Sequence, residues 1–584
     1  MNDNRNMLLA IVLSALVLIG WSLLSEQFFP TAGPQTQQVE NGKVSPAPTW
    51  QAAPPTDAPQ AIRARAAVLA ETPRVRIETP RLAGSINLKG ARFDDLVLAR
   101  ELETLDQNSQ PVRLLSPAGA RGSYFAQYGW TGQGVATPDA NSIWTASAPV
   151  LTPGKPVTLS WTNPTGQRFE LIVSVDDGYL FTVKQRVVNG GTGAVGLHVY
   201  GLASRANESP DLSSWTQHVG PNGVFNGVAQ YDVGYENLDG EEPGFFARLF
   251  GSDAKAGTNA FSSRGGWLGF TDKYWLTAVI PANGAPVEAS FRKSGSGAYQ
   301  ADYAGRPFIV APGQAVSTEA RLFAGAKEKA LLDRYENEGI TNLSKSIDWG
   351  WFEWFMRPIF NLLNWLFGQL GNFGLAIIAL TIIVRILMFP IADKQFRSMA
   401  GMRKVQPKMK ALQERYKDDK PKLQQEMLKL YQEEKIKPAA GCLPILLQIP
   451  IFYALYKVLL VSVEMRHQPF YLWIKDLSAP DPLTPVNLFG LLPFTPPAFL
   501  AIGVLPILLG VTMWIQFKLN PQQPDPVQAQ IFSIMPWVLM FVMAPFAAGL
   551  QLYWVTNNIL SIGQQAWLYK RYDMHLSDTH PIKT

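Results

Sequence analysis

Long apolar stretches lie near both ends of this 584-residue chain, and a polar, turn-rich region separates them. About 20 apolar residues are enough to span a bilayer as a helix. The last stretch, 531–569, is too long for one span, so we expect Ala544-Pro545-Phe546 to divide it. The pattern therefore predicts six transmembrane helices, at 7–24, 371–392, 441–463, 497–517, 531–545 and 546–569.

The first apolar run is interpreted as an uncleaved signal anchor. Arg5 precedes it, within a short segment 1–6, and no small-residue cleavage site of the A-x-A kind follows closely. The next residues, 25–71, are rich in Pro, Ala, Gln and Thr, and such a composition cannot bury enough apolar surface to fold. We therefore predict a flexible linker over 25–71.

Short alternating runs bounded by Gly, Pro, Asn and Asp fill residues 72–324. RFELIVSVDDGYLFTVKQRVVN is typical, with two alternating runs around a turn signal. Many short strands at regular spacing favour an all-β sandwich. A helical pattern follows, and we expect 325–350 to be a helical connecting segment that leads back toward the membrane.

An aromatic segment precedes the second predicted span. WGWFEWFMRPIFNLLNWLFGQL, at 349–370, contains four Trp and four Phe. Aromatic residues are enriched at the level of the lipid headgroups, so 351–369 is predicted to be an amphipathic helix on the outer membrane surface. The alternative is the core helix of a soluble domain.

Charge fixes the predicted orientation, because short loops rich in Lys and Arg stay in the cytoplasm. Residues 394–440 hold thirteen basic and six acidic side chains, whereas the whole chain carries +5. Residues 25–350 hold 28 basic and 31 acidic side chains and are free to be translocated. We therefore place 393–440, 518–530, the tail 570–584 and both termini inside, and the large domain and loop 464–496 outside.

The cytoplasmic segment 393–440 has the pattern of a helical hairpin. Val405, Met409, Leu412 and Tyr416 form one apolar seam, and Leu423, Met427 and Leu430 continue it after a KDDKP turn. The other faces carry basic residues, namely Lys404, Lys408, Lys410, Arg415, Lys422 and Lys429. Such a face is either simply solvated or suited to ribosomal RNA or anionic lipid.

One charge lies within the apolar stretch 371–392, at Arg385. A cation near mid-membrane costs about 2.5–3.5 kcal/mol on insertion scales, so it normally marks a wet cavity or an ion partner. The other long apolar segments contain no Asp or Glu, which leaves water, lipid phosphate or a visiting substrate as the expected partner. The alternative is a side chain that snorkels to the cytoplasmic end of the helix.

Uncharged polar residues accompany Arg385 at membrane depth. Thr381 lies one turn earlier on the same helix face, and Gln448 lies in the next apolar segment. Four more recur along one face of the last helix, namely Tyr553, Asn557, Ser561 and Gln564. They either line a hydrophilic groove or make hydrogen bonds between helices.

The sequence contains no pattern of catalytic residues. There is no G-x-x-x-x-G-K-[ST] loop and no H-E-x-x-H, and the five His residues lack metal-ligand spacing. The single cysteine, Cys442, excludes an intramolecular disulfide and is interpreted as a small apolar filler. We expect neither an enzyme nor a metal or other cofactor.

Four motifs carry a resemblance to a known family. They are QPKMKALQERYKDDKPKLQQEMLKLY at 406–431, GCLPILLQIPIFYALYKVLLVSVEMRHQPFYLWIKDLS at 441–478, LPILLGVTMW at 505–514 and GLQLYWVTNN at 549–558. Together with the order of parts, they strongly resemble the YidC membrane protein insertase family of Gram-negative inner membranes. The similarity covers essentially the whole chain.

The resemblance implies a polytopic inner-membrane protein with a five-helix insertase core and a periplasmic all-β supersandwich domain. It implies a groove that is open to the cytoplasm and lipid, where the family's arginine falls on Arg385 and its threonine on Thr381. Substrate-contacting positions fall on Phe452 and Tyr553. This chain has Trp554 and Leu509 where a tyrosine and a methionine often occur, which puts a hydroxyl role at 554 in doubt.

The resemblance also implies partners. These are nascent membrane proteins and the Sec translocon. The ribosome and anionic phospholipid are expected from the basic hairpin, and the active unit is expected to be a monomer. The tail after Tyr569 has only Lys570, Arg571 and Lys583 as basic residues, so ribosome binding is expected to be weak. A channel or transporter with a carbohydrate-binding β-domain is the alternative function.

Overall fold

The computed structural model describes residues 38–40, 43–45, 62–106, 108–211, 217–241, 257–350, 352–416, 419–433, 443–489, 491–492, 502–519 and 526–571. The chain divides into two compact units, Met1–Trp351 and Phe352–Thr584. We call them the β unit and the helical unit. The predicted signal anchor 7–24, about two thirds of the predicted linker 25–71 and Cys442 lie outside the described residues, whereas the end of that linker contains the short helix α2 (Arg65–Ala70).

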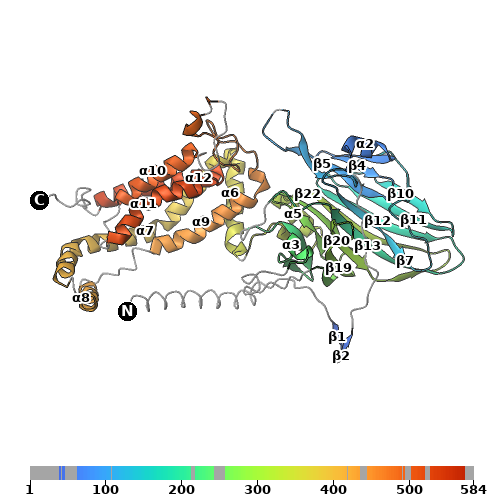
Figure 1. Cartoon of the computed structure of the whole chain (residues 1–584), viewed down its shortest axis with the longest axis horizontal. Helices are drawn as coiled ribbons and strands as arrows, with labels where there is room; N and C mark the ends of the chain where they lie inside the picture. The colour runs from blue at the N-terminus through green and yellow to red at the C-terminus, as the bar shows by residue number, and fades with distance from the viewer. Residues whose placement is uncertain are drawn as a thin grey trace. The chain divides into compact units, whose positions relative to one another are not determined.

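Two large sheets form the β unit (Figure 1). The nine-stranded sheet has the order β15 (Val228–Gln230), β14 (Gly220–Phe225), β17 (Trp267–Thr271), β18 (Trp275–Ile280), β22 (Ala315–Ala326), β12 (Leu180–Asn189), β11 (Gln167–Val175), β10 (Val157–Thr162) and β8 (Thr145–Ala146). The second sheet has the order β16 (Asn259–Arg264), β19 (Pro286–Lys293), β20 (Tyr299–Gly305), β13 (Val195–Arg205), β7 (Tyr124–Gly132), β5 (Arg92–Leu102), β4 (Leu82–Asn87), β3 (Arg74–Glu78) and β9 (Val150–Leu151). In that sheet β21 (Phe308–Val310) also pairs with β13, and β6 (Pro111–Leu115) with β5. Smaller described elements of this unit are β1 (Gln38–Glu40), β2 (Lys43–Ser45), α2 (Arg65–Ala70) and α3 (Tyr235–Leu238).

The core of the β unit lies where the two sheets face each other. Phe93 of β5 meets Phe181 of β12 edge to face, with ring centroids 5.4 Å apart. Trp130 of β7 meets Phe169 of β11 in the same way at 5.2 Å. Such pairs contribute about 0.5–1.5 kcal/mol beyond their buried area. The all-β sandwich predicted from the alternating pattern is therefore confirmed.

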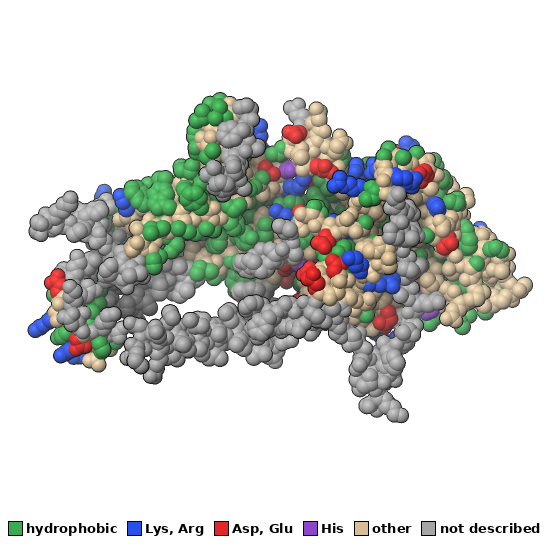
Figure 2. All heavy atoms as spheres, viewed as in Figure 1, with side chains coloured by type: hydrophobic (Ala, Val, Ile, Leu, Met, Phe, Trp, Pro, Cys, Tyr) green, Lys and Arg blue, Asp and Glu red, His purple; other side chains and the backbone are tan. Residues whose placement is uncertain are grey.

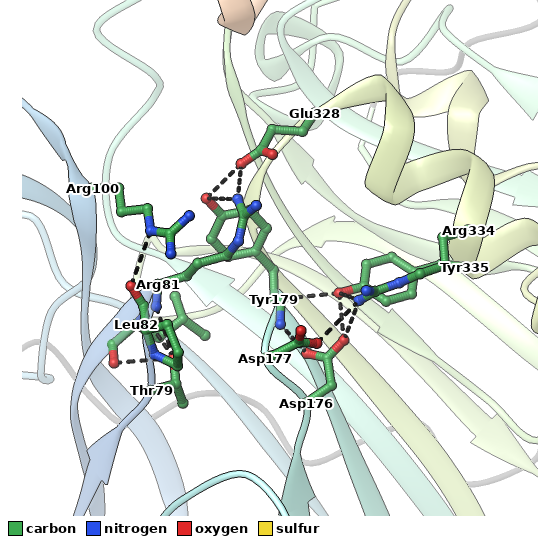
Figure 3. A network of polar contacts seen from close by, with 12 residues as sticks. Thr79, Arg81, Leu82, Arg100, Asp176, Asp177, Tyr179, Glu328, Arg334 and Tyr335 are labelled. Atoms are coloured by element: carbon green, nitrogen blue, oxygen red, sulfur yellow. Dashed lines mark hydrogen bonds and ion pairs between the residues drawn. The ribbon is translucent and has the colours of Figure 1, made fainter.

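The segment 325–350 belongs to the β unit rather than to a separate connector. It contains the end of β22, α5 (Lys329–Asn337) and the short helix η1 (Leu343–Ser346). Figure 3 shows how α5 is held: Tyr335 Oη donates to Asp176 Oδ2 at 2.7 Å, and Glu328 pairs with Arg81. Asp176 lies in the turn between β11 and β12, so side chains far apart in sequence fix the helix to the sandwich.

The helical unit contains α6 (Glu353–Leu370), α7 (Phe373–Arg415), α8 (Lys420–Glu433), α9 (Leu443–Val461), α10 (Val504–Leu519), α11 (Pro526–Met543) and α12 (Ala548–Arg571). Two short 3₁₀ helices, η3 (Val463–Met465) and η4 (Pro485–Asn487), lie between α9 and α10. Figure 2 shows hydrophobic side chains gathered on the visible face of these helices, whereas the visible face of the β unit is mixed.

The helix that holds the predicted span 371–392 is longer than that span, because α7 continues through Pro390 to Arg415. The residues that follow Ala392 are mainly good helix formers such as Lys, Gln, Met and Arg, and the helix continues through Gly401 and Pro407. The predicted seam of the hairpin forms between α7 and α8, where Val405, Met409 and Leu430 are buried together.

Among the described residues, one helix, Phe373–Lys394, is long and apolar enough to cross a membrane by length and composition. Three shorter apolar helices cover Gln448–Val461, Val504–Leu519 and Gln530–Met543. The span predicted to start at 497 enters α10 only at Val504, because Ile502 and Gly503 are not helical. The count of six transmembrane helices therefore stays a prediction.

Candidate functional site

Arg385 lies on α7, about 18 Å along the helix from its first residue and about 14 Å from Lys394. Its half-buried guanidinium contacts the neighbouring helix α12. Nε donates to Asn557 Oδ1 at 2.8 Å, and Nη2 donates to Asn557 O at 3.3 Å and to Ser561 Oγ. Asn557 and Ser561 reach the same guanidinium because residues four apart share one helix face.

These contacts correct the expectation that only water, lipid or a substrate solvates Arg385. The partners are an amide, a backbone carbonyl and a hydroxyl, and all of them are neutral. No carboxylate of the described residues forms an ion pair with Arg385. The side chain is therefore oriented by α12, while no described carboxylate compensates its positive charge. The sequence signal for these partners was the recurrence of polar residues along one face of α12.

Thr381 lies one turn before Arg385, with its side chain in the protein interior. It is only 1% exposed, and Oγ1 donates to Ile377 O of the same helix at 2.6 Å. A Thr hydroxyl has one hydrogen to donate. Its donor capacity is therefore used within α7 in this structure.

A second polar contact joins α9 to α12. Gln448 Nε2 donates to Tyr553 Oη at 2.6 Å. Tyr553 is 1% exposed, whereas Gln448 is half-buried. The structure thus brings Gln448 and Tyr553 together, one turn from Asn557 along α12.

An aromatic row continues from this contact along α9. The rings of Phe452 and Trp554 are perpendicular, with centroids 5.1 Å apart, and Phe452 stacks on Tyr456 at 6.4 Å. Both Phe452 and Trp554 are half-buried, and Trp554 Nε1 is buried without a hydrogen-bond partner. Leu509 is fully buried in α10. Of the four predicted contact residues, Phe452 and Trp554 are the more accessible.

The basic residues of the hairpin lie largely on its outer faces. Lys408, Arg415, Lys422 and Lys429 are exposed, while the side chains of Lys404 and Lys410 lie outside the described set. Lys422 lies over the Tyr416 ring at 5.6 Å, and Lys429 pairs with Glu426 at 3.0 Å. The described part of the chain contains no group of three or more His, Cys, Asp or Glu that could hold a metal ion.

Comparisons with known proteins place both units in families. Residues 365–575 match the family described as 60Kd inner membrane protein, and residues 74–362 match the YidC periplasmic domain. A membrane protein insertase YidC from Zymomonas mobilis is 48% identical over 98% of this chain and 96% of its own. One from Rhizobium meliloti is 44% identical over the same shares. A solved structure described as an active YidC insertase covers 94% of this chain and 98% of its own, with 17% identity and a TM-score of 0.35.

Proposed function

The chain belongs to the YidC family of membrane protein insertases, and from this membership we propose how its helical unit handles a client. It is an insertase and not an enzyme, its clients are nascent membrane proteins, and its β unit is a periplasmic domain. The relatives do not favour the alternative of a channel or transporter.

Transfer of an apolar client segment into lipid is favourable without nucleotide hydrolysis. About twenty apolar residues gain roughly 6–12 kcal/mol on entering lipid, at about 0.3–0.6 kcal/mol each. The barrier comes from the polar residues beside that segment, because their charges and backbone groups must cross hydrocarbon. The insertase is therefore expected to shorten the path through hydrocarbon that these polar flanking residues must cross.

In our proposal Arg385, with Thr381 and Gln448, forms the inner end of a hydrophilic groove open to the cytoplasm and to lipid. The observation that carries it is the half-buried guanidinium held by the neutral Asn557 and Ser561. Because these partners do not cancel the charge, it attracts acidic residues that flank a client segment. The membrane potential adds about 2.3 kcal/mol per charge per 100 mV for acidic flanks that move outward.

Replacing Arg385 tests this electrostatic role. We expect Arg385→Ala to slow insertion of clients with acidic translocated tails, and Arg385→Glu to slow it further, because attraction becomes repulsion. Clients with neutral tails should be affected much less. The assay is insertion into vesicles that contain the purified variant, with paired clients that differ only in the tail. Equal losses for both tails would refute the role of charge.

The client segment itself is proposed to slide along Phe452, Leu509, Tyr553 and Trp554 into lipid. The half-buried Phe452–Trp554 pair supports this path, since it offers apolar contact next to the groove residues. Photocrosslinkers at 452 and 554 should capture a stalled nascent chain more strongly than those at the buried positions 509 and 553. A crosslinker at Met356, buried in α6, is the negative control. The reverse ranking would place the path elsewhere.

The basic hairpin is proposed to hold a polyanion at the cytoplasmic surface, either ribosomal RNA or anionic phospholipid. Arg415 and Lys422 are exposed and suit this role. Arg415→Glu with Lys422→Glu should lower binding to ribosomes or to anionic vesicles, measured separately by co-sedimentation and flotation, and the loss should shrink at high salt. Leu428→Glu, at another exposed hairpin position, controls for a carboxylate added without loss of a basic residue. Unchanged binding to both polyanions would remove the hairpin from this role.

Three further proposals rest on the family and on the charge pattern. The protein spans the inner membrane six times with both termini in the cytoplasm, it acts as a monomer, and it receives some clients beside the Sec translocon. Client insertion into vesicles that each hold one copy of the protein tests whether the monomer is active. The same assay with and without the Sec translocon tests whether clients arrive beside it. Labelling of single cysteines from either side of the membrane tests the topology.

A further inference from the structure

The loop between α9 and α10 turns bulky apolar side chains outward. Leu488, Phe489 and Leu491 are 53%, 52% and 81% exposed, and Val486 and Leu492 are exposed as well. We call these five residues the apolar tip. Over the 36 residues from Pro482 to Phe517 the sequence contains no Asp, Glu, Lys, Arg or His. Apolar surface of this kind is unfavourable in water and marks an interaction site.

The apolar tip has a defined backbone. Thr484 Oγ1 accepts from Val486 N at 3.3 Å and so caps η4. Phe489 N donates to Thr484 O at 2.9 Å, and Leu492 N donates to Asn487 O at 3.1 Å. Leu488 N and Leu491 N also donate within the loop, to Pro485 O and Leu488 O. These backbone donors need no water, which is the condition for a loop at the edge of hydrocarbon.

Two residues of the tip adopt the left-handed conformation that bulky side chains avoid. Leu488 has φ 51° and Phe489 has φ 59°. Such strain persists where the surroundings determine it, and it clusters at functional positions. Here the strained residues are among those that turn apolar side chains outward.

Asp481 fixes the tip to the start of α10. Its buried carboxylate accepts from Trp473 Nε1 at 2.9 Å, from Leu483 N at 3.1 Å and from Leu505 N at 2.7 Å. A Cβ at Gly503 would come within 2.6 Å of the Asp481 side chain, so only glycine allows this approach. The loop is therefore positioned by the helix that follows it.

The rest of the same loop touches the starts of two other helices. Asn372 Nδ2, at the start of α7, donates to Pro469 O at 3.3 Å, and Gly549 N of α12 donates to Leu477 O at 2.9 Å. The loop therefore lies at the end of the helical unit where α7, α10 and α12 begin, opposite the basic hairpin. Tyr471, 55% exposed, and Trp473 lie in this loop, and such aromatic residues are enriched at membrane interfaces.

We propose that the apolar tip inserts into the acyl-chain boundary of the periplasmic leaflet and anchors this end of the helical unit in lipid. The occupant of this surface is lipid because the surface is uncharged, its backbone donors are satisfied internally, and it lies where the membrane-spanning helices end. The inference rests on the proposed topology, in which this end faces the periplasm.

Fluorescence quenching on the full chain tests the anchor. Cys442 is replaced by serine, and Leu491→Cys or Val486→Cys carries an environment-sensitive dye in phosphatidylcholine vesicles. We expect quenching by brominated acyl chains and several-fold weaker quenching by iodide than for a dye at Ile309→Cys. Ile309 is a matched control because it is 75% exposed on β21 of the β unit.

Two results overturn the proposal. Iodide quenching at 491 and 486 equal to that at 309 would place the tip in water. Protection from both quenchers would mean that protein covers it. Client insertion is measured on the same vesicles. A tip that lacks lipid contact while insertion stays normal would overturn the lipid anchor alone. A negative result in the Arg385 test would overturn the electrostatic role of Arg385 and would not affect the proposed anchor.

Discussion

Arg385 has a positive charge that its neighbours orient but do not cancel. A carboxylate at the same distance would hold the side chain equally well and would remove its long-range attraction. The neutral partners Asn557 and Ser561 satisfy hydrogen bonds of the guanidinium without that loss. At the scale of one residue, the proposed attraction of acidic client flanks therefore depends on an amide rather than an acid at position 557.

Asn557→Asp separates the charge of the site from its shape. The new carboxylate is nearly isosteric and replaces the amide oxygen that lies 2.8 Å from Arg385 Nε. We expect insertion of acidic-tailed clients to fall to the level of Arg385→Ala, while the variant folds and inserts neutral-tailed clients as before. The paired-client vesicle assay measures both rates. Full activity of the variant on acidic tails would show that net charge is irrelevant.

The break between α11 and α12 is held by one side chain. Gln551 is fully buried, and its Nε2 donates to the carbonyls of Met543 at 2.9 Å and Phe546 at 2.8 Å, with Ala544 at 3.3 Å. Met543 is the last residue of α11 and its carbonyl also accepts from Phe546 N at 3.1 Å, whereas Ala544 and Phe546 lie in the break itself. An unpaired carbonyl at membrane depth is costly, so the element boundary depends on this amide.

Gln551→Met should lower the free energy of unfolding by about 1–3 kcal/mol, because it removes the side-chain donor to the carbonyls of Ala544 and Phe546. Gln564→Met on the same helix is the matched control. The Nε2 of Gln564 is buried and has no hydrogen-bond partner, so its removal should cost little. Thermal unfolding of both variants in one detergent measures the difference. Equal shifts of Tm would argue against the role of Gln551.

At the scale of the whole molecule, the β unit includes the segment that leads out of it. His218 contacts this segment, since its backbone N donates to Asp348 Oδ2 at 3.0 Å. Its Nε2 lies 2.7 Å from Pro221 O and donates there. Burial lowers the pKa of His218 below its usual value of about 6.5. The folded β unit therefore favours neutral His218.

Acid should weaken the β unit through His218. The unfolded state binds a proton at His218 more readily than the folded state does. The contribution of neutral His218 to stability is therefore complete above about pH 6.5 and falls as the pH drops toward the lower pKa of the folded state. The loss is at most about 1.4 kcal/mol per pH unit. His218→Gln should show a smaller loss between about pH 7.5 and about pH 5. Pulse proteolysis of the full chain in urea, followed on β-unit fragments, measures this. Identical pH dependence in both proteins would exclude His218.

The sequence by itself determined the broad organisation. Alternation with period two predicts the sandwich because one face of each strand must be buried. The apolar stretches and the basic segment predict membrane helices and an orientation, because hydrocarbon excludes charge. The seam of Val405, Met409 and Leu430 was likewise readable, since it depends on neighbouring turns of two helices close in sequence.

Only the tertiary structure decided which distant residues meet. Arg385 is 172 positions from Asn557, and periodicity on one helix does not specify the partner helix. The same holds for Asp481, which caps α10 from the preceding loop, and for α5, which joins the sandwich through the turn at Asp176. Local pattern sets which face of an element is polar, whereas the packing of whole elements sets what that face touches.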